Sequence, residues 1–389
     1  MTRQRKTPDL LSELLAGSET EEGFKEKLRG CSQAKARTNT VADHMVNHEP
    51  LLFKEAELLR ACSTWLVFRH FFTAGKYRLI GGCTCKKHLI CAMCAWRRSA
   101  KTVMAYSAKV EMVMNKHPQL IPVLVTMTIK NGADLDERFS HIESCYSKMV
   151  RNRSLARNGN RHKTVFRQIE GAAGAFEFKR GKGSGLWHPH LHMIALVDQD
   201  TDLLAMAWDT SQEWRGLTKD SSIIDIRPID MTEEKSRMGA ICEVFRYALK
   251  FGEMSVADQV EAYKVLKSRL LVRNFGCLRC KVPDDLHDTV EDELKLQPYI
   301  DLVYEYSKKK GFFLSDVTDT QDTLTHALVR PKRSEGQKAA HRLSKKLFVS
   351  IPDPDSTGPK RISLDSDYMK KWVQENPIQN TFKPEEVPF

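Results

Sequence analysis

The alternation of apolar and polar residues is clearest in the middle of the chain. Residues 121–131 (IPVLVTMTIKN) alternate, are rich in β-branched side chains and end at a turn-forming Asn-Gly pair, which indicates a strand. Residues 171–197 hold two apolar arms around a Gly- and Lys-rich turn, which indicates a hairpin. A further strand is predicted at 222–228, and helices at 135–157, 199–216 and 232–251. The pattern predicts an α+β fold with helices flanking an antiparallel sheet.

The regions on either side have weaker periodicity. Residues 1–50 are polar and mixed in charge, so we expect a frayed arm or short helices there. Further helices are predicted at 51–72, 95–116 and 255–272. We divide the chain into a polar N-terminal extension (1–50), a helical and Cys-rich region (51–105), a central domain (106–285) and an auxiliary helical region with a basic tail (286–389).

The charge balance points to a polyanionic partner. The chain has 61 Lys and Arg against 50 Asp and Glu, a net charge of +11, which favours nucleic acid before an acidic membrane surface. The residues expected to contact phosphates are Arg97, Arg98 and Lys101. The start of the chain lacks an apolar signal core, and the run at 120–129 is too short to cross a bilayer. We expect a cytoplasmic protein that does not bind membranes.

Three histidines alternate in the return arm of the hairpin, in the segment GLWHPHLHMIALV (185–197). Residues two apart in a strand point to the same face, so His188, His190 and His192 line one surface. Imidazole is the commonest protein ligand for metals. This spacing therefore predicts a site for a metal ion or a phosphate, rather than a half-exposed strand that is rich in histidine by chance.

The predicted helix around residues 240–253 (AICEVFRYALKFGE) has a polar stripe. On a helical wheel Glu243, Tyr247 and Lys250 lie within it, while Ile241 and Phe245 lie on the opposite, core-facing side. Taken alone, this arrangement is also typical of a solvated helix surface. Its interpretation depends on the histidines.

The ten cysteines include a cluster within CTCKKHLICAMC (83–94). In a reducing compartment such spaced pairs indicate metal ligands or free thiols before disulfides. The predicted ligands of a structural zinc ion are Cys83, Cys85, Cys91 and Cys94. A second pair, Cys277 and Cys280, is an alternative source of two ligands. Since the spacing is not a standard finger, reduced thiols without metal are a further alternative. The isolated cysteines expected in the core are Cys31, Cys62, Cys145 and Cys242.

Three motifs occur in a specific order: VTMTIKN on a strand, HPHLH on a later strand and EVFRYALK on a helix. Together they resemble the single-tyrosine plasmid initiators of rolling-circle replication, which belong to the HUH endonuclease superfamily. The resemblance covers roughly residues 56–285 and implies an HUH-like nicking domain within 106–285. It also implies a Cys cluster followed by Trp-Arg, as in CAMCAWRR (91–98), which favours zinc.

The resemblance implies a metal site on the hairpin. His190 and His192 match the His-hydrophobic-His pair that binds Mg²⁺ or Mn²⁺ in the family. Glu177, on the preceding strand, stands where the family supplies a carboxylate ligand. His188 shares the face and is expected to hydrogen-bond or to join the ligands.

The resemblance also implies roles for three residues of the predicted helix around 240–253. Tyr247 matches the nucleophile, which attacks the scissile phosphate and leaves a 5′-phosphotyrosine and a free 3′-hydroxyl. Lys250 is expected to lower the pKa of the phenol or to contact phosphate. Glu243 is expected to activate water in a later, terminating cut.

The resemblance thus implies a plasmid-encoded bacterial initiator that nicks its origin, as single-stranded or supercoiled DNA, and cooperates with a host helicase and a DNA polymerase. A mobilisation relaxase or a transposase would use the same chemistry. Two other classes are less favoured: a histidine-triad nucleotide hydrolase, which would need no cation, and a zinc-dependent DNA-binding regulator, which would form no covalent adduct.

Overall fold

The computed structural model describes residues 20–159, 162–181, 183–230, 234–245, 254–295, 297–319, 348–351 and 360–363. The chain divides into two compact units, residues 1–322 and 323–389. In the second unit, β10 (Phe348–Ile351) and β11 (Lys360–Ser363) form an antiparallel pair. All other described elements belong to the first unit.

Five of the described strands form an antiparallel sheet in the order β6-β3-β5-β4-β7. They are β3 (Leu120–Thr128), β4 (Gly171–Arg180), β5 (Trp187–Asp198), β6 (Ile224–Pro228) and β7 (Val272–Gly276). The predicted strands and hairpin are confirmed, as is the α+β class. The helix predicted at 255–272 is shorter, because α8 (Val256–Leu266) ends and the chain then forms β7 by pairing with β4, about a hundred residues earlier.

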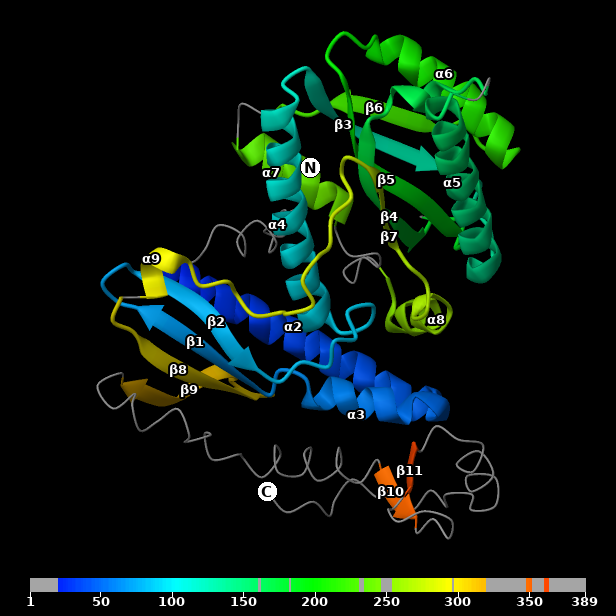
Figure 1. The fold of residues 1–389 in the computed structure, drawn as a ribbon. Coiled ribbons are helices and arrows are strands. Elements are labelled where there is room, and N and C mark those ends of the chain that lie inside the picture. The colour runs from blue at the N-terminus through cyan, green and yellow to red at the C-terminus, as the bar shows by residue number, and fades with distance from the viewer. Residues whose placement is uncertain are drawn as a thin grey trace, which may run out of the picture. The chain divides into compact units, whose positions relative to one another are not determined.

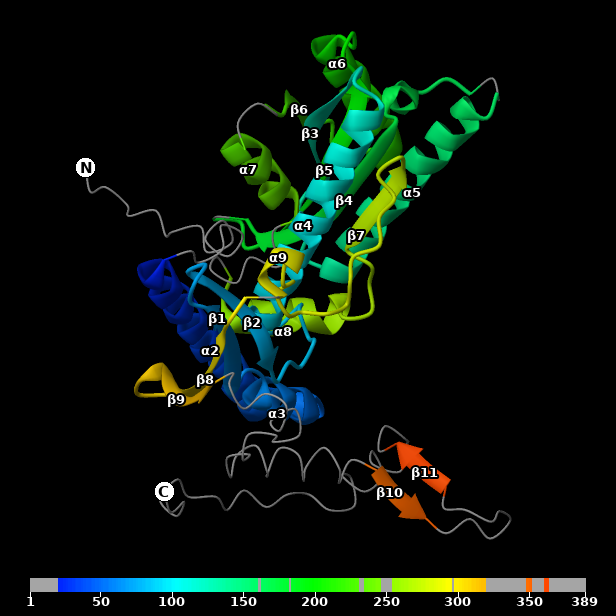
Figure 2. The ribbon, with the colours of Figure 1, turned by 60° about the vertical axis from the view of Figure 1, so that its left-hand side comes forward.

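Side-chain alternation gives this sheet two different faces. On one face, residues such as Val125, Phe176 and Met193 pack against α5 (Leu135–Arg157) and α6 (Leu203–Thr218). On the other, Leu124 and Ile194 join a core that includes α4 (Ala92–Lys116) and α7 (Glu234–Phe245). Figure 1 and Figure 2 show α4 and α7 on one side of the sheet and α5 on the other. The helices predicted at 95–116, 135–157 and 199–216 are therefore confirmed within a few residues, and the one at 232–251 is described as far as Phe245.

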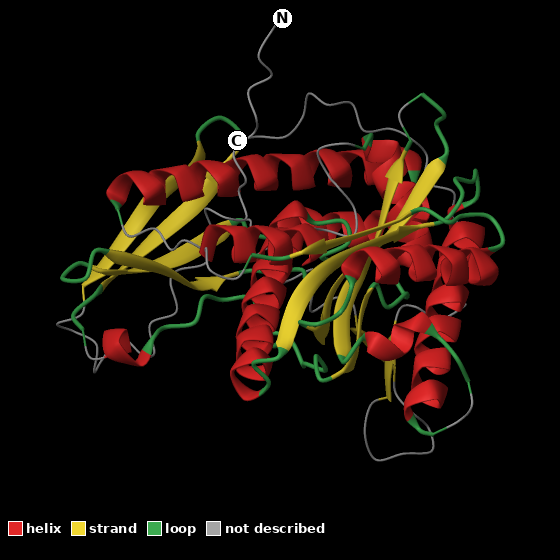
Figure 3. Ribbon diagram, turned by 90° about the horizontal axis from the view of Figure 1, so that it is seen from above, coloured by secondary structure: helices red, strands yellow, loops and turns green. Residues whose placement is uncertain are grey.

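A second antiparallel sheet has the order β2-β1-β8-β9. Its strands are β1 (Trp65–Phe71), β2 (Lys76–Gly82), β8 (Ile300–Ser307) and β9 (Gly311–Asp319). The other elements of the first unit are α2 (Glu21–His48), η1 (Pro50–Leu52), α3 (Phe53–Ala61), η2 (Val165–Gln168) and α9 (Asp292–Lys295). Helix α2 packs on this sheet, where the Phe24 ring stacks on that of Tyr77 with centroids 4.1 Å apart. Figure 3 shows both sheets, in yellow, packed against helices.

Three predictions for the outer regions are wrong. Residues 21–48 form one long helix whose buried side chains join the core, rather than an extension. Within the helix predicted at 51–72, residues 65–71 form a strand instead. Residues 300–319, expected to be helical, form the hairpin β8-β9. In each case contacts with a distant part of the chain determine the secondary structure. Strand β1 lies between β2 and β8, and α2 covers them.

Within the described ranges, no helix combines the length and the apolar character that crossing a membrane requires.

Candidate metal centre

Glu177, His190 and His192 form a compact cluster on the sheet face that α4 and α7 cover. Glu177 on β4 lies directly opposite His190 on β5 in the hairpin register, and His192 follows two residues later on the same face. Their ligand atoms all lie within 4.8 Å of one another. The structure thus brings together three of the four residues predicted for the divalent cation.

The neighbouring strand β3 orients His192. Thr126 lies opposite His192 in the register, and its Oγ1 is 3.0 Å from His192 Nδ1. The other ring nitrogen, Nε2, lies 3.5 Å from a carboxylate oxygen of Glu177. A hydrogen bond at Nδ1 fixes the ring so that Nε2 faces the cluster, as second-shell partners do in metal sites.

His188 lies beside the cluster but has a different partner. Its Nδ1 donates a hydrogen bond to Asn131 Oδ1, and its ring meets that of His190 edge-on, with centroids 4.1 Å apart. Burial, with the nearby Lys179 ammonium, lowers the pKa of His188. A neutral, hydrogen-bonded imidazole fits the expectation that His188 supports the site.

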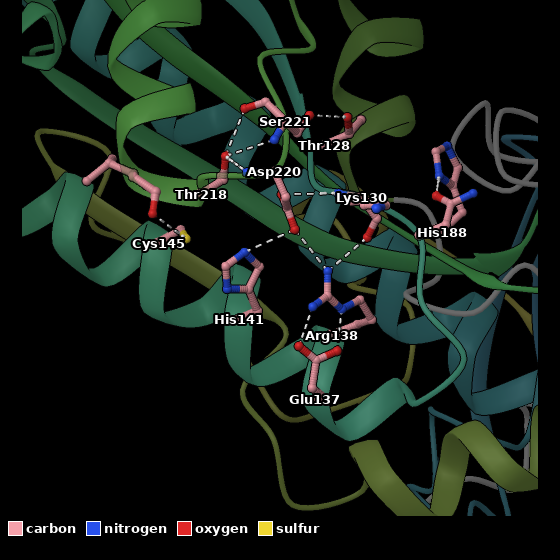
Figure 4. Close-up of polar contacts among 12 residues, drawn as sticks. Thr128, Lys130, Glu137, Arg138, His141, Cys145, His188, Thr218, Asp220 and Ser221 are labelled. Atoms are coloured by element: carbon pink, nitrogen blue, oxygen red, sulfur yellow. Dashed lines mark hydrogen bonds and ion pairs between the residues drawn. The ribbon is translucent and has the colours of Figure 1, made fainter.

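Asp220 holds Lys130, the residue before Asn131 in the chain (Figure 4). The Asp220 carboxylate accepts hydrogen bonds from the backbone N–H of Lys130, at 3.3 Å, and from Arg138, at 3.0 Å. It also lies 3.4 Å from His141 Nε2. Arg138 in turn donates to the Lys130 carbonyl, at 3.1 Å. This network anchors the end of β3 next to His188.

Helix α7 lies over the same sheet face and presents Glu243 at its surface. Ile241 and Phe245 are buried, as the helical wheel predicts, whereas the Glu243 side chain is 44% exposed. Glu243 lies 3.6 Å from Arg227 of β6, which also contacts Asp225 at 2.7 Å. Tyr247 and Lys250 lie outside the described residues.

The chemistry of the Glu177–His190–His192 cluster suits a divalent cation. One carboxylate and two imidazoles supply three ligands, and their donor atoms lie close enough together to hold one ion. A cation held by these three residues would keep coordination positions open for a phosphate oxygen.

A second cluster consists of the thiols of Cys62, Cys85, Cys91 and Cys94, all within 4.8 Å of one another. Cys62 Sγ lies 3.5 Å from Cys94 Sγ and 3.6 Å from Cys91 Sγ, and Cys85 Sγ lies 3.6 Å from Cys94 Sγ. Thiolates around tetrahedral zinc, with Zn–S bonds of about 2.3 Å, lie about 3.8 Å apart. The cluster therefore has the spacing of a four-cysteine metal site.

Backbone and charge favour a thiolate at one position of this cluster, Cys62. The N–H of Cys94 points to Cys91 Sγ at 3.5 Å, and that of Cys85 to Cys62 Sγ at 3.4 Å. Hydrogen bonds from the three neighbouring thiols lower the pKa of Cys62, whereas the hydrogen bond to Cys62 raises the pKa of Cys85 and burial raises that of Cys91. The buried Lys35 ammonium donates to the carbonyls of Leu59 and Arg60, at 3.2 and 2.7 Å, just before Cys62.

The structure corrects the predicted zinc ligands. Cys83 is replaced by Cys62, since the Cys83 thiol instead contacts Thr64 Oγ1, at 3.3 Å, and the Ala61 carbonyl, at 2.9 Å. Cys277 and Cys280 lie elsewhere, next to Gly171 and the Ala105 carbonyl respectively. Sequence spacing gave no signal for Cys62. In the β1-β2 hairpin Leu66 lies opposite Gly82. The segment that follows β2 therefore lies next to Cys62, which precedes β1.

One predicted phosphate contact is also corrected. The Arg97 side chain is only 6% exposed and binds the Leu286 carbonyl and Asp288. Arg98 donates to the Pro283 carbonyl at 2.7 Å and remains 30% exposed. Lys101 contacts Thr289 at 3.3 Å. Arg97 therefore stabilises the fold, and Arg98 and Lys101 are the accessible cations of this group.

Comparison with known proteins identifies relatives over much of the chain. A family model described as "Replication protein" matches residues 76–311, more than half of the chain. "Protein rep" of Bacillus amyloliquefaciens is 27% identical over 281 residues, which cover 70% of this chain and 76% of the relative. "Protein rep" of a Bacillus species is 25% identical over 57% of this chain and 73% of the relative.

A third relative is "Protein rep" of Streptococcus pneumoniae serotype 2, which is 26% identical over 48% of this chain and 57% of its own length. No solved structure gives a significant match. Both metal-site histidines and Glu177 lie within the segment that matches the family model, whereas Cys62 precedes it. The chain belongs to the replication protein family.

Proposed function

We propose that this protein is a plasmid replication initiator that nicks one strand of its origin and primes rolling-circle synthesis. Membership of the replication protein family supports the role in replication. The observation that carries the nicking activity is the Glu177–His190–His192 cluster, which lies on the sheet face covered by the helix that leads to Tyr247.

Glu177, His190 and His192 would hold Mg²⁺ or Mn²⁺. Bound there, the cation would polarise the scissile phosphate and stabilise the charge that develops on it. Thr126 keeps His192 turned toward Glu177, and Asn131 holds His188 beside the ligands. These contacts pre-organise the site before DNA binds.

Tyr247 would be the nucleophile. Its phenolic oxygen forms a bond to phosphorus while the bond from phosphorus to the 3′-oxygen breaks. The phenolic proton is lost and the leaving 3′-oxygen gains one, which yields a 5′-phosphotyrosine and a 3′-hydroxyl primer. Lys250, one helical turn from Tyr247 in the predicted pattern, would stabilise the phenolate or contact the phosphate.

Glu243 would act when the regenerated site is cut again. Its side chain is accessible to water and lies on the face of α7 that points away from the buried Ile241. As general base it would remove a proton from water, which then attacks the second scissile phosphate. This last cut would release the protein. DNA polymerase and a host helicase would act between the two cuts, in the cytoplasm.

The four-cysteine cluster would hold structural zinc. It joins the end of α3 to the start of α4, because Cys62 follows α3 and Cys91 and Cys94 stand at the beginning of α4. The nicking domain and the N-terminal helices would thus be linked through one ion.

Incubation with supercoiled DNA carrying the cognate origin tests the proposal. With Mg²⁺, we expect site-specific nicking and a protein–DNA adduct that survives denaturation, while a chelator should abolish both. Tyr247→Phe should form no adduct. Tyr299→Phe, at a tyrosine that packs on Phe71 in the other sheet, is the matched control and should nick normally. A Tyr247→Phe protein that still becomes attached to DNA would refute the assignment.

A further inference from the structure

A cavity of about 250 Å³ has Ala175, the residue opposite His192 in the sheet, in its lining. Its floor includes Ala175 of β4 and Val272 of β7, and Phe245 of α7 closes one side. Ser99 of α4 and His88, from the loop before that helix, line another side. The cavity is thus built from elements that the fold brings together from five separate parts of the chain.

The sheet register places this cavity next to the ligands. Ala175 lies opposite His192 on one side and opposite Val272 on the other. Residues paired in this way share a face, and adjacent strands are about 4.8 Å apart. The cavity floor therefore begins one strand away from His192, on the face where the cation would bind the scissile phosphate.

The walls and the rim of the cavity differ in character. The walls are mainly apolar, from Phe245, Val272 and similar residues. The more exposed lining residues, which form the rim, include His88, Arg98, Arg269 and Leu270. Arg98 is paired with the carboxylate of Asp284 at 3.4 Å, and that carboxylate is 93% exposed. Such a surface pair is weak, about 0–1 kcal/mol, so a phosphate can replace it.

The size favours a flat group over a longer ligand. Sites for drug-sized molecules range over about 300–1,000 Å³, and one water occupies about 30 Å³. A cavity of about 250 Å³ has room for one heterocyclic ring system and the solvent around it. An apolar slot with cations at its mouth matches a nucleotide, with a base that stacks on side chains and a charged backbone.

From this geometry we infer that the cavity binds one unstacked base of the substrate strand, next to the scissile phosphate. The inference rests on the proposed function and deepens it, because the base selected here contributes to recognition of the nick site. Ser99 and Val272 would set the space available to the base, and Arg98 would contact the adjoining phosphate.

Binding of single-stranded oligonucleotides in EDTA tests this without cleavage. The oligonucleotides cover the mapped nick site or, for a protein that does not cut, the tightest-binding part of the origin. One abasic site is moved along them, one nucleotide at a time. For the unchanged protein we expect one position where loss of the base weakens binding about tenfold, because stacking of one base is worth about 1–3 kcal/mol.

Two variants narrow the cavity from different elements. Ser99→Leu and Val272→Phe should each bind the intact strand about tenfold more weakly and lose sensitivity at that one position. Ala108→Leu, on an exposed part of α4 outside the cavity, is the control. Its binding should depend on the position of the abasic site as in the unchanged protein. Thermal melting checks that each variant is folded.

The outcomes separate the two proposals. An unchanged protein with no base-sensitive position, or folded cavity variants that keep its profile, would overturn the inference even if the protein nicks DNA. His190→Ala should keep the profile and lose cleavage. The protein could also show one base-sensitive position that is lost in the cavity variants, yet never cut DNA. That result would support base binding in the cavity and refute the proposed nicking activity.

Discussion

The carboxylate of Glu243 on α7 lies 3.6 Å from the guanidinium of Arg227 on β6. Both side chains are about half exposed, at 44% and 55%, and Arg227 has a second carboxylate partner in Asp225. A surface ion pair of this kind contributes about 0–1 kcal/mol. Separating Glu243 from Arg227 would therefore cost little free energy.

Glu243→Ala should slow the second, terminating cut and leave the first cut intact. Because Tyr247 remains, the variant should nick and form the adduct, but release should slow by about 100-fold or more, since general bases contribute about 10²–10⁴ in rate. Replication products longer than one unit, resolved on denaturing gels, are the expected signature. Arg227→Ala keeps the carboxylate and should terminate normally. Normal termination by Glu243→Ala, or failure to nick at all, would refute the role.

Loss of a metal ligand should stop cleavage but not binding. His190→Ala, His192→Ala and Glu177→Ala each remove one donor atom from the cluster, whereas DNA-binding proteins in general make about half to two-thirds of their hydrogen bonds to DNA phosphates and sugars. Cleavage of single-stranded origin DNA should be abolished, with affinity in EDTA unchanged. His188→Ala should retain part of the activity, because His188 bonds to Asn131. Equal loss in all four variants would make His188 a ligand as well.

Thr126→Val should weaken binding of the cation without removing a ligand. The substitution keeps the shape of the side chain and deletes the hydroxyl that lies 3.0 Å from His192 Nδ1. The Mg²⁺ or Mn²⁺ concentration for half-maximal cleavage should rise about 10- to 100-fold, as is usual for second-shell partners. Thr128→Val, whose hydroxyl contacts Ser221, is the matched control. Equal effects of both substitutions would argue against orientation of His192 by Thr126.

Cys62→Ser should remove zinc, and Cys83→Ser should not. The purified protein should contain zinc, measured by atomic emission, and Cys62→Ser should lose it together with Cys85→Ser, Cys91→Ser and Cys94→Ser. The melting temperature should fall by about 5 °C or more, since each kcal/mol corresponds to ~2–4 °C in a domain of this size. Zinc loss in Cys83→Ser but not in Cys62→Ser would restore the ligand set predicted from spacing.

Asp288 should make the fold sensitive to acid. Burial by itself raises the pKa of this carboxyl, but the charges of Lys27 and Arg97 and the N–H of Leu79 outweigh it and hold the pKa below its ordinary value. A lowered folded-state pKa stabilises the protein above the unfolded value, about 3.9. That stability is lost as the pH falls through the lower folded value.

Asp288→Asn should destabilise the protein at pH 7 by about 1–3 kcal/mol, because Lys27 and Arg97 lose their shared charge partner. Urea unfolding between pH 7 and 3 should show a smaller loss of stability in the variant than in the unchanged protein. Asp301→Asn, at the Arg69–Asp301 pair of the second sheet, is a control for a carboxylate whose partner is 25% exposed. An identical pH profile for Asp288→Asn and the unchanged protein would contradict this role.

The sequence by itself determined the local geometry of the site. A period of two residues puts His188, His190 and His192 on one face of any strand, and a helical period puts Ile241 and Phe245 on the buried side of α7. These patterns depend on neighbours a few residues away, so they hold whatever the rest of the chain does. The same reason explains why β3, α5 and the hairpin were predictable.

Only the tertiary structure decided which distant residues meet. The register of β4 on β5 sets Glu177 opposite His190, where a slip of one residue would turn it to the other face. The ends of the β1-β2 hairpin bring Cys62 rather than Cys83 to the four-cysteine cluster. Arg97 lies inside because Asp288, 191 residues later, lies next to it. Such contacts arise from packing of whole elements, which no local pattern of residues encodes.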